Sequence, residues 1–532
     1  MINKKPRSMA KQKLKKTLED FYKRKAYLLD ENRIEAVTKR KAKGQRTARE
    51  NIADLCDKDS FLEVGSLIIA AQRTRKTEED LIKETPADGL ITGIANVNGV
   101  DFGKAKSKCL VLSYDYTVMA GTQGAFNHKK TDRVLQMAKK GGMPIIFFLE
   151  GGGGRPGDVD FDNISSGGLD VPTFVSYARL SGKQPRIAIV SGYSFAGNAA
   201  LAGCSDVIIA TENTSLGMGG PAMIEGGGLG VFHPKDIGPS KIQSENGVID
   251  ILVKDEAEAV LAAKKYLSYF QGDLEKWKCE PQEVLRDLIP EDRRYAYDIK
   301  KIIKALTDKD SVLELRAAFA RNMITSFVRI DGKPYGLLAN SSRHLGGAID
   351  SDASDKAARF MQLCNAFGIP MISLCDAPGF MVGPKCEETA MVRHSSRMFI
   401  TAAQLKVPLF TVVLRKAYGL GAMAMAGGGM HESFFTISWP TGEFGGMGLE
   451  GAVKLGFKKE LEAQKDPDTR QKLNDELVNA AYQKGKAIKA AAYLEFDEVI
   501  DPKDTRTWIS NSLASISEQT YKGGTGHAVD SW

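Results

Sequence analysis

The chain has 532 residues, of which 43% are hydrophobic and 26% charged, and it carries 53 glycines. Its length exceeds what a single hydrophobic core supports, and its apolar content is too high for a disordered chain, so we expect at least two globular domains. No apolar run in the sequence reaches the roughly 18 residues that a membrane span needs. The basic start also lacks the apolar core of a secretory signal. These features predict a cytoplasmic protein without membrane insertion.

The net charge of +7 is concentrated at the N-terminus. Residues 1–50 hold 17 Lys and Arg against 6 Asp and Glu, a net of +11, which leaves the rest of the chain near −4. Apolar residues recur at helical spacing from Leu14 to Leu29. We therefore expect a basic helical arm, either a solvated helix or an element that docks an acidic partner or the adenosine phosphates of a ligand. No nucleic-acid partner is expected, because no recognised binding motif accompanies the charge.

The cysteine and histidine spacings do not favour a metal site. None of the seven cysteines forms a CxxC pair, so neither disulfides nor a zinc ribbon is expected. The six histidines lack metal-ligand spacing, and the sequence contains neither HExxH nor the nucleophile motif GxSxG. We predict a site without metal.

Short apolar runs alternate with helical stretches from about residue 85 onward, which predicts an α/β architecture with largely buried strands. The expected strands are Ile91–Val97, Cys109–Tyr114, Ile145–Leu149 and Ile187–Val190. The helical stretches between them include Thr131–Lys140 and Thr173–Gly182.

The sequence contains an internal repeat. Residues 142–150 (GMPIIFFLE) resemble residues 368–376 (GIPMISLCD), 226 positions later. Residues 185–193 resemble 408–418, where Pro185 and Pro408 are 223 apart and Tyr193 and Tyr418 are 225 apart. Small-residue helices follow in both copies. We therefore predict two similar α/β domains, 51–290 and 291–532, behind the arm of residues 1–50.

Glycines gather in four clusters, at 151–157, 217–230, 419–429 and 442–451. A strand that turns through glycine into a helix leaves backbone N–H groups unpaired at the helix start, where they can hold an anion or a developing oxyanion. A purely structural role in tight turns and close packing is the alternative. The phosphate-loop motif GxxxxGK[ST] is absent, and the loose GxGxxG matches lack a downstream acidic residue, so no nucleotide-binding loop is expected.

Three segments resemble one enzyme family, the carboxyltransferase (β) subunits of biotin-dependent acyl-CoA carboxylases, which act on propionyl-, acetyl- or methylcrotonyl-CoA. These segments are Glu150–Arg155, Arg415–Met425 and Trp439–Gly448. Residues 47–61 and 290–298 resemble the N-terminal segment of the family and its link between domains. The resemblance covers about residues 40–515.

The resemblance implies a fold of two tandem crotonase-like domains and a homohexamer built as a trimer of dimers. It places an acyl-CoA thioester, the substrate, on the N-terminal domain of one subunit and biotin on the C-terminal domain of another. The chain has no Met-Lys-Met attachment site and no ATP-binding carboxylase domain. The expected partners therefore carry these parts: a biotin carboxylase and a biotin carboxyl carrier that brings carboxybiotin.

The implied reaction moves the carboxyl group of carboxybiotin to the α carbon of a short-chain acyl-CoA, through enolates held in two backbone oxyanion holes. By position, one hole maps to Gly152, Gly153 and Gly154, and the other to Leu420, Gly421 and Ala422. The expected substrate-binding residues are Arg155, Ala196, Gly197, Tyr418, Gly419 and Met423. Arg155 could instead brace its turn, and Met423 could simply pack within its helix. Sequence leaves open which hole serves which substrate.

Two other functions stay open. A transferase subunit of a biotin-dependent acyl-CoA decarboxylase would show the same site and run the chemistry in reverse. A non-catalytic scaffold that binds CoA is suggested by departures from the family pattern, because many members read Ser-Gly-Gly-Ala-Arg where this chain has Gly151–Arg155 (GGGGR). Further departures follow the second glycine turn, at Ala422 and Met423, where the family shapes its acyl pocket.

Overall fold

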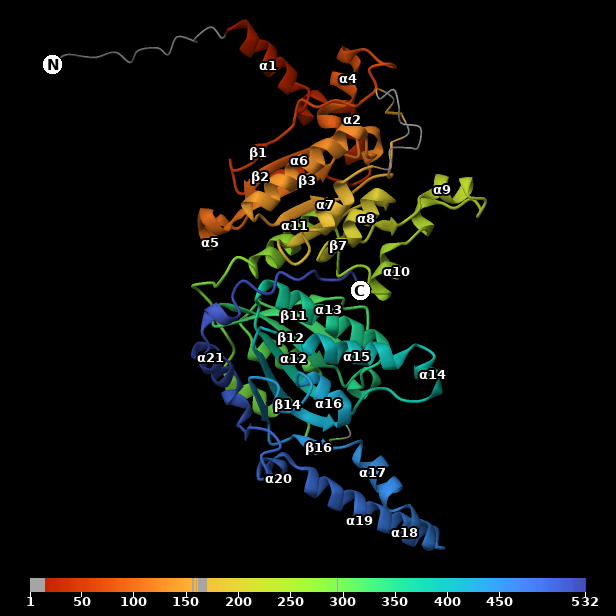
Figure 1. The fold of residues 1–532 in the computed structure, drawn as a ribbon, viewed down its shortest axis with the longest axis vertical. Helices are drawn as coiled ribbons and strands as arrows, with labels where there is room; N and C mark the ends of the chain where they lie inside the picture. The colour runs from red at the N-terminus through yellow and green to blue at the C-terminus, as the bar shows by residue number, and fades with distance from the viewer. Residues whose placement is uncertain (1–14, 156, 159, 161–169, 294) are drawn as a thin grey trace, which may run out of the picture.

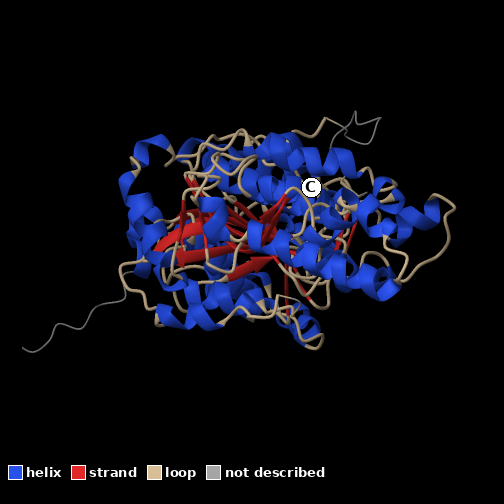
Figure 2. Ribbon diagram, turned by 90° about the horizontal axis from the view of Figure 1, so that it is seen from below, coloured by secondary structure: helices blue, strands red, loops and turns tan. Residues whose placement is uncertain are grey.

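A computed structural model describes residues 15–155, 157–158, 160, 170–293 and 295–532. Within them the chain forms two mostly parallel sheets, one in each half, and helices cover the faces of both (Figures 1 and 2). The first sheet has the order β1 (Leu62–Glu63), β2 (Leu90–Asn96), β3 (Lys108–Tyr114), β4 (Ile145–Phe148), β5 (Arg186–Val190), β7 (Val207–Thr211) and β9 (Ile251–Val253). The strands β6 (Tyr193–Phe195) and β8 (Ser215–Gly217) form a separate parallel pair.

The second sheet repeats this plan. Its order is β10 (Leu313–Leu315), β11 (Met323–Ile330), β12 (Lys333–Asn340), β13 (Met371–Ala377), β14 (Leu409–Tyr418), β15 (Phe435–Ser438) and β17 (Glu498–Val499). The strand β16 (Glu443–Gly445) pairs with the end of β14. The predicted strands of the first half and the α/β class are confirmed.

The helices of the first half begin with the basic arm. They are α1 (Lys16–Ala26), α2 (Ile34–Lys41), α3 (Ala48–Leu55), α4 (Glu78–Glu84), α5 (Gly99–Lys106), α6 (Ala125–Gly141), α7 (Thr173–Ala178), α8 (Gly197–Gly203), α9 (Pro221–Gly226), α10 (Ser240–Glu245) and α11 (Glu256–Ser268). The predicted basic helix is present as α1. Residues 1–14 of the predicted arm lie outside the described part of the chain.

The second half carries its own helices and a projecting helical hairpin (Figure 1). They are α12 (Ile299–Leu306), α13 (Ser351–Phe367), α14 (Pro384–Glu387), α15 (Met391–Ala402), α16 (Gly419–Met425), α17 (Leu449–Gly456), α18 (Lys458–Ala463), α19 (Pro467–Gly485), α20 (Ala487–Ala491) and α21 (Thr505–Ser515). Among the described residues, none of these helices combines the length and the apolar composition needed to cross a membrane.

The internal repeat holds residue by residue in the first part of each domain. Helices α6 and α13 begin 226 residues apart and end 226 residues apart, and each stops at a glycine in the left-handed conformation, Gly142 with φ 60° and Gly368 with φ 70°. A glycine there ends a helix because it lacks the Cβ that would clash. The predicted offset of 226 is therefore a structural equivalence.

The offset in the second part of each domain is 223. Phe195 lies opposite Gly217 in the β6–β8 pair, and Tyr418 lies opposite Gly445 in the β14–β16 pair. Tyr418 therefore corresponds to Phe195, not to Tyr193 as the sequence match indicated. The error arises because the two tyrosines look alike in sequence, while strand register decides which residues are equivalent.

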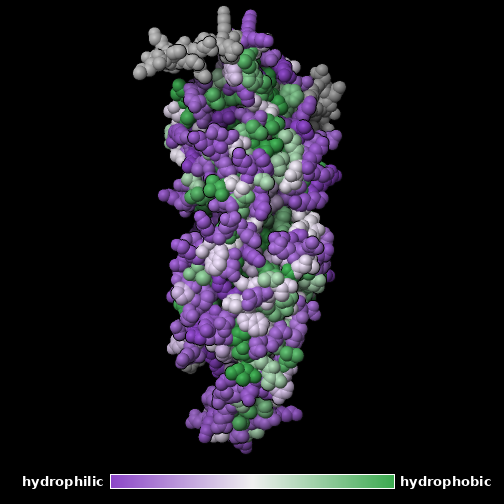
Figure 3. All heavy atoms as spheres, turned by 90° about the vertical axis from the view of Figure 1, so that its left-hand side faces the viewer, coloured by the Kyte–Doolittle hydropathy of each residue, from purple (hydrophilic) through white to green (hydrophobic). Residues whose placement is uncertain are grey.

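The two halves share one hydrophobic core. Buried residues from β3 and β5 of the first sheet, from α11 and α12, and from β11 to β15 of the second sheet form a continuous cluster. The final segment joins the halves again, since Ser181 Oγ donates to the carbonyl of Val529 at 2.9 Å. The predicted boundary near Pro290 falls between α11 and α12. On the face shown in Figure 3, hydrophilic residues predominate and the hydrophobic ones form small separate groups.

Candidate active site

The first glycine cluster forms a turn directly after the central strand β4. Gly153 has φ 86°, a conformation that glycine adopts without strain. Its carbonyl accepts a hydrogen bond from the N–H of Gln123 at 2.7 Å, while the N–H of Arg155 donates to the Gln123 carbonyl at 2.8 Å. This pairing fixes the turn against the segment that leads into α6. Gly152 and Gly154 stay exposed on either side.

The start of α8 lies against this turn. A Cβ atom on Gly153 would lie 2.7 Å from the Cβ of Ala196, and one on Gly197 would overlap the Gln123 amide. Ala196 itself has φ 50°, which places it outside the helix as its N-cap. The first N–H groups of a helix have no partner within it. The predicted residues Gly152, Gly153, Gly154, Ala196 and Gly197 therefore converge. The N–H groups of Gly152 and Ala196 already donate to the carbonyls of Ala120 and Gly217, both at 3.2 Å, so the candidate donors here are those of Gly153, Gly154 and Gly197.

The second domain builds the same arrangement from equivalent residues. Gly379 follows β13 with φ 128°, and its carbonyl accepts from the N–H of Ile349 at 3.1 Å, as Gly153 does from Gln123. A Cβ on Gly421 would lie 2.6 Å from the Gly379 carbonyl carbon. Gly419, with φ 55°, takes the position of Ala196. The start of α16 therefore lies against the Gly379 turn.

Each site thus combines a turn with a helix start, whereas the sequence prediction named the turn of one domain and the helix start of the other. Residues 152–154 correspond to 378–380, and Leu420, Gly421 and Ala422 correspond to 197–199. Gly379 and Phe380 were missed as site residues. Adding the repeat offset of 226 to residue numbers 153 and 154 gives Gly379 and Phe380, so the repeat in the sequence could have identified them.

Arg155 braces the first turn. Its Nη1 lies 2.5 Å from the carboxylate of Asp88, its Nη2 donates to the Thr122 carbonyl at 3.0 Å, and only 2% of its side chain is exposed. Asp88 is completely buried, so this ion pair offsets a charge that would otherwise be desolvated. Two roles were considered for Arg155, bracing its turn or binding the substrate, and its contacts within this chain are those expected of a residue that braces the turn.

The remaining predicted residues around α16 divide into buried and accessible ones. Tyr418 is buried, and its hydroxyl donates to Glu443 at 2.8 Å; burial and that carboxylate raise the pKa of Tyr418. Ala422 is also buried and packs within the domain. By contrast, the side chains of Leu420 and Met423 are 61% and 37% exposed, so both are available to a ligand.

A buried acid lies at the end of each central strand and is held by an arginine. Glu150 accepts two hydrogen bonds from Arg40, at 2.8 and 2.6 Å, and Asp376 accepts one from Arg415 at 3.1 Å. The first pair ties the helix α2 of the arm to the residue just before the glycine turn. The sequence repeat aligns Glu150 with Asp376 but does not indicate the arginine partner of either acid.

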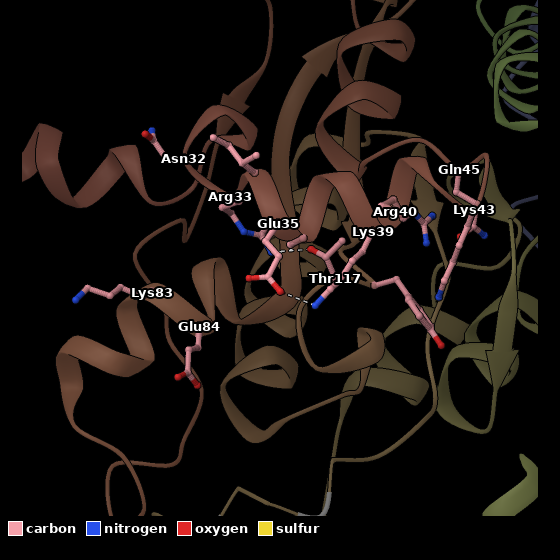
Figure 4. A pocket seen from close by; sticks show the side chains of 13 residues that line it. Asn32, Arg33, Glu35, Lys39, Arg40, Lys43, Gln45, Lys83, Glu84 and Thr117 are labelled. Atoms are coloured by element: carbon pink, nitrogen blue, oxygen red, sulfur yellow. Dashed lines mark hydrogen bonds and ion pairs between the residues drawn. The ribbon is translucent and has the colours of Figure 1, made fainter.

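A pocket of about 590 Å³ opens between α2 and α4 next to this ion pair (Figure 4). Arg33 in it is engaged by Asp115 at 2.6 Å, and Lys39 by Glu35 at 2.6 Å. Lys83 is paired with Glu79 at 2.8 Å and Arg40 with Glu150, so among the described residues Lys43 is the lining cation that has no ion-pair partner. Cationic side chains outnumber acidic ones in the lining, which consists of Asn32, Arg33, Ile34, Glu35, Ala36, Lys39, Arg40, Lys43, Gln45, Lys83, Glu84, Tyr116 and Thr117.

Gly192 lies between the pocket residue Gln45 and Glu150, the acid that precedes the glycine turn. A Cβ on Gly192 would lie 2.5 Å from Glu150 Oε1 and 3.0 Å from Gln45 Nε2, so these three residues are in contact. The arm supplies most of these cations, namely Arg33, Lys39, Arg40 and Lys43.

Comparison with known proteins assigns most of the chain to one family. Residues 39–523 match the model of the carboxyl transferase domain. The methylmalonyl-CoA carboxyltransferase 12S subunit of Propionibacterium freudenreichii subsp. shermanii is 34% identical over 487 residues, which cover 90% of either chain.

Two solved structures share the fold of this chain. The first, a single-chain, multi-domain long-chain acyl-CoA carboxylase, has a TM-score of 0.89 and 55% identity over 94% of this chain. This chain spans about half of that protein, 49% of its length. The second, transcarboxylase 12S, was described as a hexamer with methylmalonyl-CoA bound; it has a TM-score of 0.81 and 30% identity, covering 95% of this chain and 96% of the other. The chain belongs to the carboxyltransferase domain family and has its crotonase-like fold in both halves.

Proposed function

We propose that this chain transfers a carboxyl group between carboxybiotin on a partner protein and the α carbon of an acyl-CoA. One observation carries this function: the two domains build equivalent sites, each from a glycine turn and a helix start, with backbone donors between them. Two enolates form in such a reaction, and each needs donors placed before the charge develops. Two copies of one arrangement meet that need.

We infer the substrate of each site from what surrounds it. The cationic pocket beside the first glycine turn suits the phosphates of CoA, so the site at Gly153, Ala196 and Gly197 takes the thioester. The site at Gly379, Gly419 and Gly421 suits the uncharged biotin ring, because backbone donors there are flanked by the accessible apolar side chains Leu420 and Met423. Carboxybiotin supplies the carboxyl group and the base, and this chain's residues orient the reactants and stabilise the charge.

The expected partners are a biotin carboxylase and a biotin carboxyl carrier, and the expected assembly is a hexamer, as described for transcarboxylase 12S. A decarboxylase would use the same two sites in reverse, so the partner proteins decide the direction. The predicted short acyl chain rests on the family resemblance alone. The relative with 55% identity is described as a long-chain acyl-CoA carboxylase, which reopens the acyl length.

The function is tested by CO2 release from malonyl-, methylmalonyl- and longer carboxyacyl-CoA, with and without free biotin. Biotin-dependent release is expected. No release from any of them by an intact, CoA-binding protein would overturn the proposal and favour the scaffold function.

The CoA pocket is tested separately with Lys43→Glu. This change is expected to raise KM about tenfold with little change in kcat, because a phosphate contact outside the reacting centre contributes equally to ground and transition states. Lys472→Glu, an exposed change on the projecting helix α19, is the matched control. Equal effects of the two variants would contradict the assignment of the pocket.

A further inference from the structure

A strained turn of residues 87–89 leads into β2. Ala87, Asp88 and Gly89 have φ values of 53°, 51° and 69°, so three consecutive residues adopt the left-handed conformation. This conformation is unfavourable for alanine and aspartate, because each carries a Cβ. Backbone strain persists only where the surrounding structure imposes it, and it concentrates at functional sites. The strain therefore indicates a role for the 87–89 turn beyond joining α4 to β2.

The helix α6 imposes this shape on the 87–89 turn. Lys130 Nζ donates to the carbonyl of Ala87 at 3.1 Å and also to the carbonyl of Leu90. Asn127 Nδ2, from the preceding turn of the same helix, donates to the carbonyl of Asp88 at 3.2 Å. Both side chains are buried, and hydrogen bonds are stronger in a buried environment than in water. The 87–89 turn is thus fixed to α6.

The carboxylate of Asp88 links the 87–89 turn to the first glycine turn. Asp88 Oδ1 lies 2.5 Å from Nη1 of Arg155, the residue that follows Gly154. The same guanidinium donates through Nε to Thr122 Oγ1 at 3.3 Å and through Nη2 to the Thr122 carbonyl at 3.0 Å. Breaking a buried pair of charges is strongly unfavourable, so the geometry of the pair is fixed. The position of α6 therefore helps to determine where the N–H groups of Gly153 and Gly154 lie.

A second series of buried hydrogen bonds runs from α6 to the start of α8. Asn127 Oδ1 accepts from the Tyr114 hydroxyl at 3.2 Å, and the Tyr114 oxygen accepts from Gln123 Nε2 at 3.1 Å. The backbone of Gln123 pairs with Gly153, and its side-chain amide contacts Gly197, because a Cβ there would overlap it. The two series of contacts thus reach both parts of the candidate thioester site, the glycine turn and the helix start.

The second domain builds its site from different side chains. The offset of 226 pairs four members of the network with other residue types: Tyr114, Gln123, Asn127 and Arg155 correspond to Asn340, Ile349, Ala353 and Met381. The backbone pairing is kept, because the N–H of Met381 donates to the Ile349 carbonyl at 2.8 Å. Three of the four replacements are apolar, so they form neither the ion pair nor the side-chain hydrogen bonds. The polar network therefore distinguishes the first site from its copy.

We propose that Asp88 and Asn127 are positioning residues for the thioester site, an inference that rests on the proposed function. Both side chains are completely buried, so they act on the substrate through the backbone donors of Gly153, Gly154 and Gly197. An oxyanion hole stabilises an enolate best when its donors are in place before the charge develops. A displacement of about 1 Å lowers rates about 100-fold. Because the network is buried within one chain, assembly of several copies leaves its contacts as they are.

The test uses one variant of each positioning residue. Asp88→Asn removes the charge that holds Arg155 and is expected to lower kcat of biotin-dependent CO2 release from a carboxyacyl-CoA about 100-fold, with KM within about twofold of wild type. Asn127→Ala, which brings in the residue type found at position 353, is expected to lower the same kcat about tenfold. CO2 release from free carboxybiotin without acyl-CoA needs only the biotin site, so both variants are expected to keep its rate within about twofold.

Asp206→Asn is the matched control, because it neutralises the carboxylate of another buried ion pair. Asp206 lies 2.6 Å from Arg186 at the start of β5, which is the edge of the sheet opposite to the glycine turn. Both aspartate variants are expected to lower the free energy of unfolding, but Asp206→Asn is expected to keep kcat. Equal losses of kcat in the two variants would overturn the proposal. A loss of CO2 release from carboxybiotin as large as that from the ester would overturn it as well.

Combining Asp88→Asn with Arg155→Met separates positioning from stability. The double variant removes both charges of the pair, so it is expected to regain part of the stability that Asp88→Asn loses, while kcat stays about 100-fold low. Recovery of kcat together with stability would overturn the proposal. Wild-type kcat in both Asp88→Asn and Asn127→Ala would overturn the positioning role alone, whereas no biotin-dependent release from any ester by the wild-type protein would overturn the proposed function.

Discussion

Gly153→Ala probes the candidate thioester site through its closest contact. The added methyl would stand 2.7 Å from the Cβ of Ala196, where carbon atoms in contact are normally about 3.5–4.0 Å apart. The turn and the start of α8 must therefore separate by about 1 Å. A positive φ of 86° adds about 1–2 kcal/mol of strain for a residue with a Cβ. A misplacement of about 1 Å lowers rates about 100-fold.

We therefore expect kcat of biotin-dependent CO2 release to fall about 100-fold, and the free energy of unfolding in urea to fall by about 1–2 kcal/mol. Gly203→Ala, at the other end of α8, is the control, because nothing lies within 4 Å of its added methyl. It should match wild type in rate. A Gly153→Ala enzyme with kcat within threefold of wild type, despite the expected loss of stability, would refute the role of this turn in catalysis.

Two further changes test the scaffold around the sites. Lys356→Met is expected to lower the free energy of unfolding in urea by about 2–3 kcal/mol. The reason is that the buried amine of Lys356 donates to the carbonyls of Arg316 and Phe319 at 2.9 and 2.8 Å. A loss no larger than that caused by the exposed change Lys472→Met would contradict this reasoning. His128→Gln is expected to reduce the loss of stability between pH 7.5 and 5.5. Burial, with Arg155 nearby, lowers the pKa of His128 in the folded protein. As the pH falls below 6.5, the unfolded chain therefore binds more protons at His128 than the folded chain does, and the free energy of unfolding falls. Equal pH dependence of the variant and the wild type would exclude this contribution.

The buried lysines show what the internal repeat could reveal and what it could not. Lys356 lies 226 residues after Lys130, which donates to the carbonyls of Ala87 and Leu90 in the same way. The offset follows from sequence, because strands and glycine turns repeat visibly. The structural role of these lysines cannot be read from the sequence, because a lysine within an amphipathic helix normally indicates a face exposed to solvent. Only the packing of each helix on a strained turn shows that its amine is buried.

The second half of each domain was less predictable for a related reason. The sequence match rested on two tyrosines, while equivalence is set by strand pairing, which aligns Phe195 with Tyr418. For the same reason, the predicted oxyanion holes took the turn from one domain and the helix start from the other. A turn and a helix start about 43 residues apart meet only through the order of strands in the sheet, and local patterns carry no information about that contact.

The two sites differ in the side chains that surround their glycine turns and helix starts. The glycine turns and helix starts are equivalent, so the backbone donors alone would not tell a thioester from a biotin ring. The arm of residues 1–50 adds the cations of the pocket near Glu150, whereas Leu420 and Met423 flank the second site. A duplicated scaffold can therefore supply one kind of charge stabilisation twice, while the side chains around each copy decide which substrate it receives. Substitutions of those side chains should change KM, and substitutions in the repeated turns should change kcat.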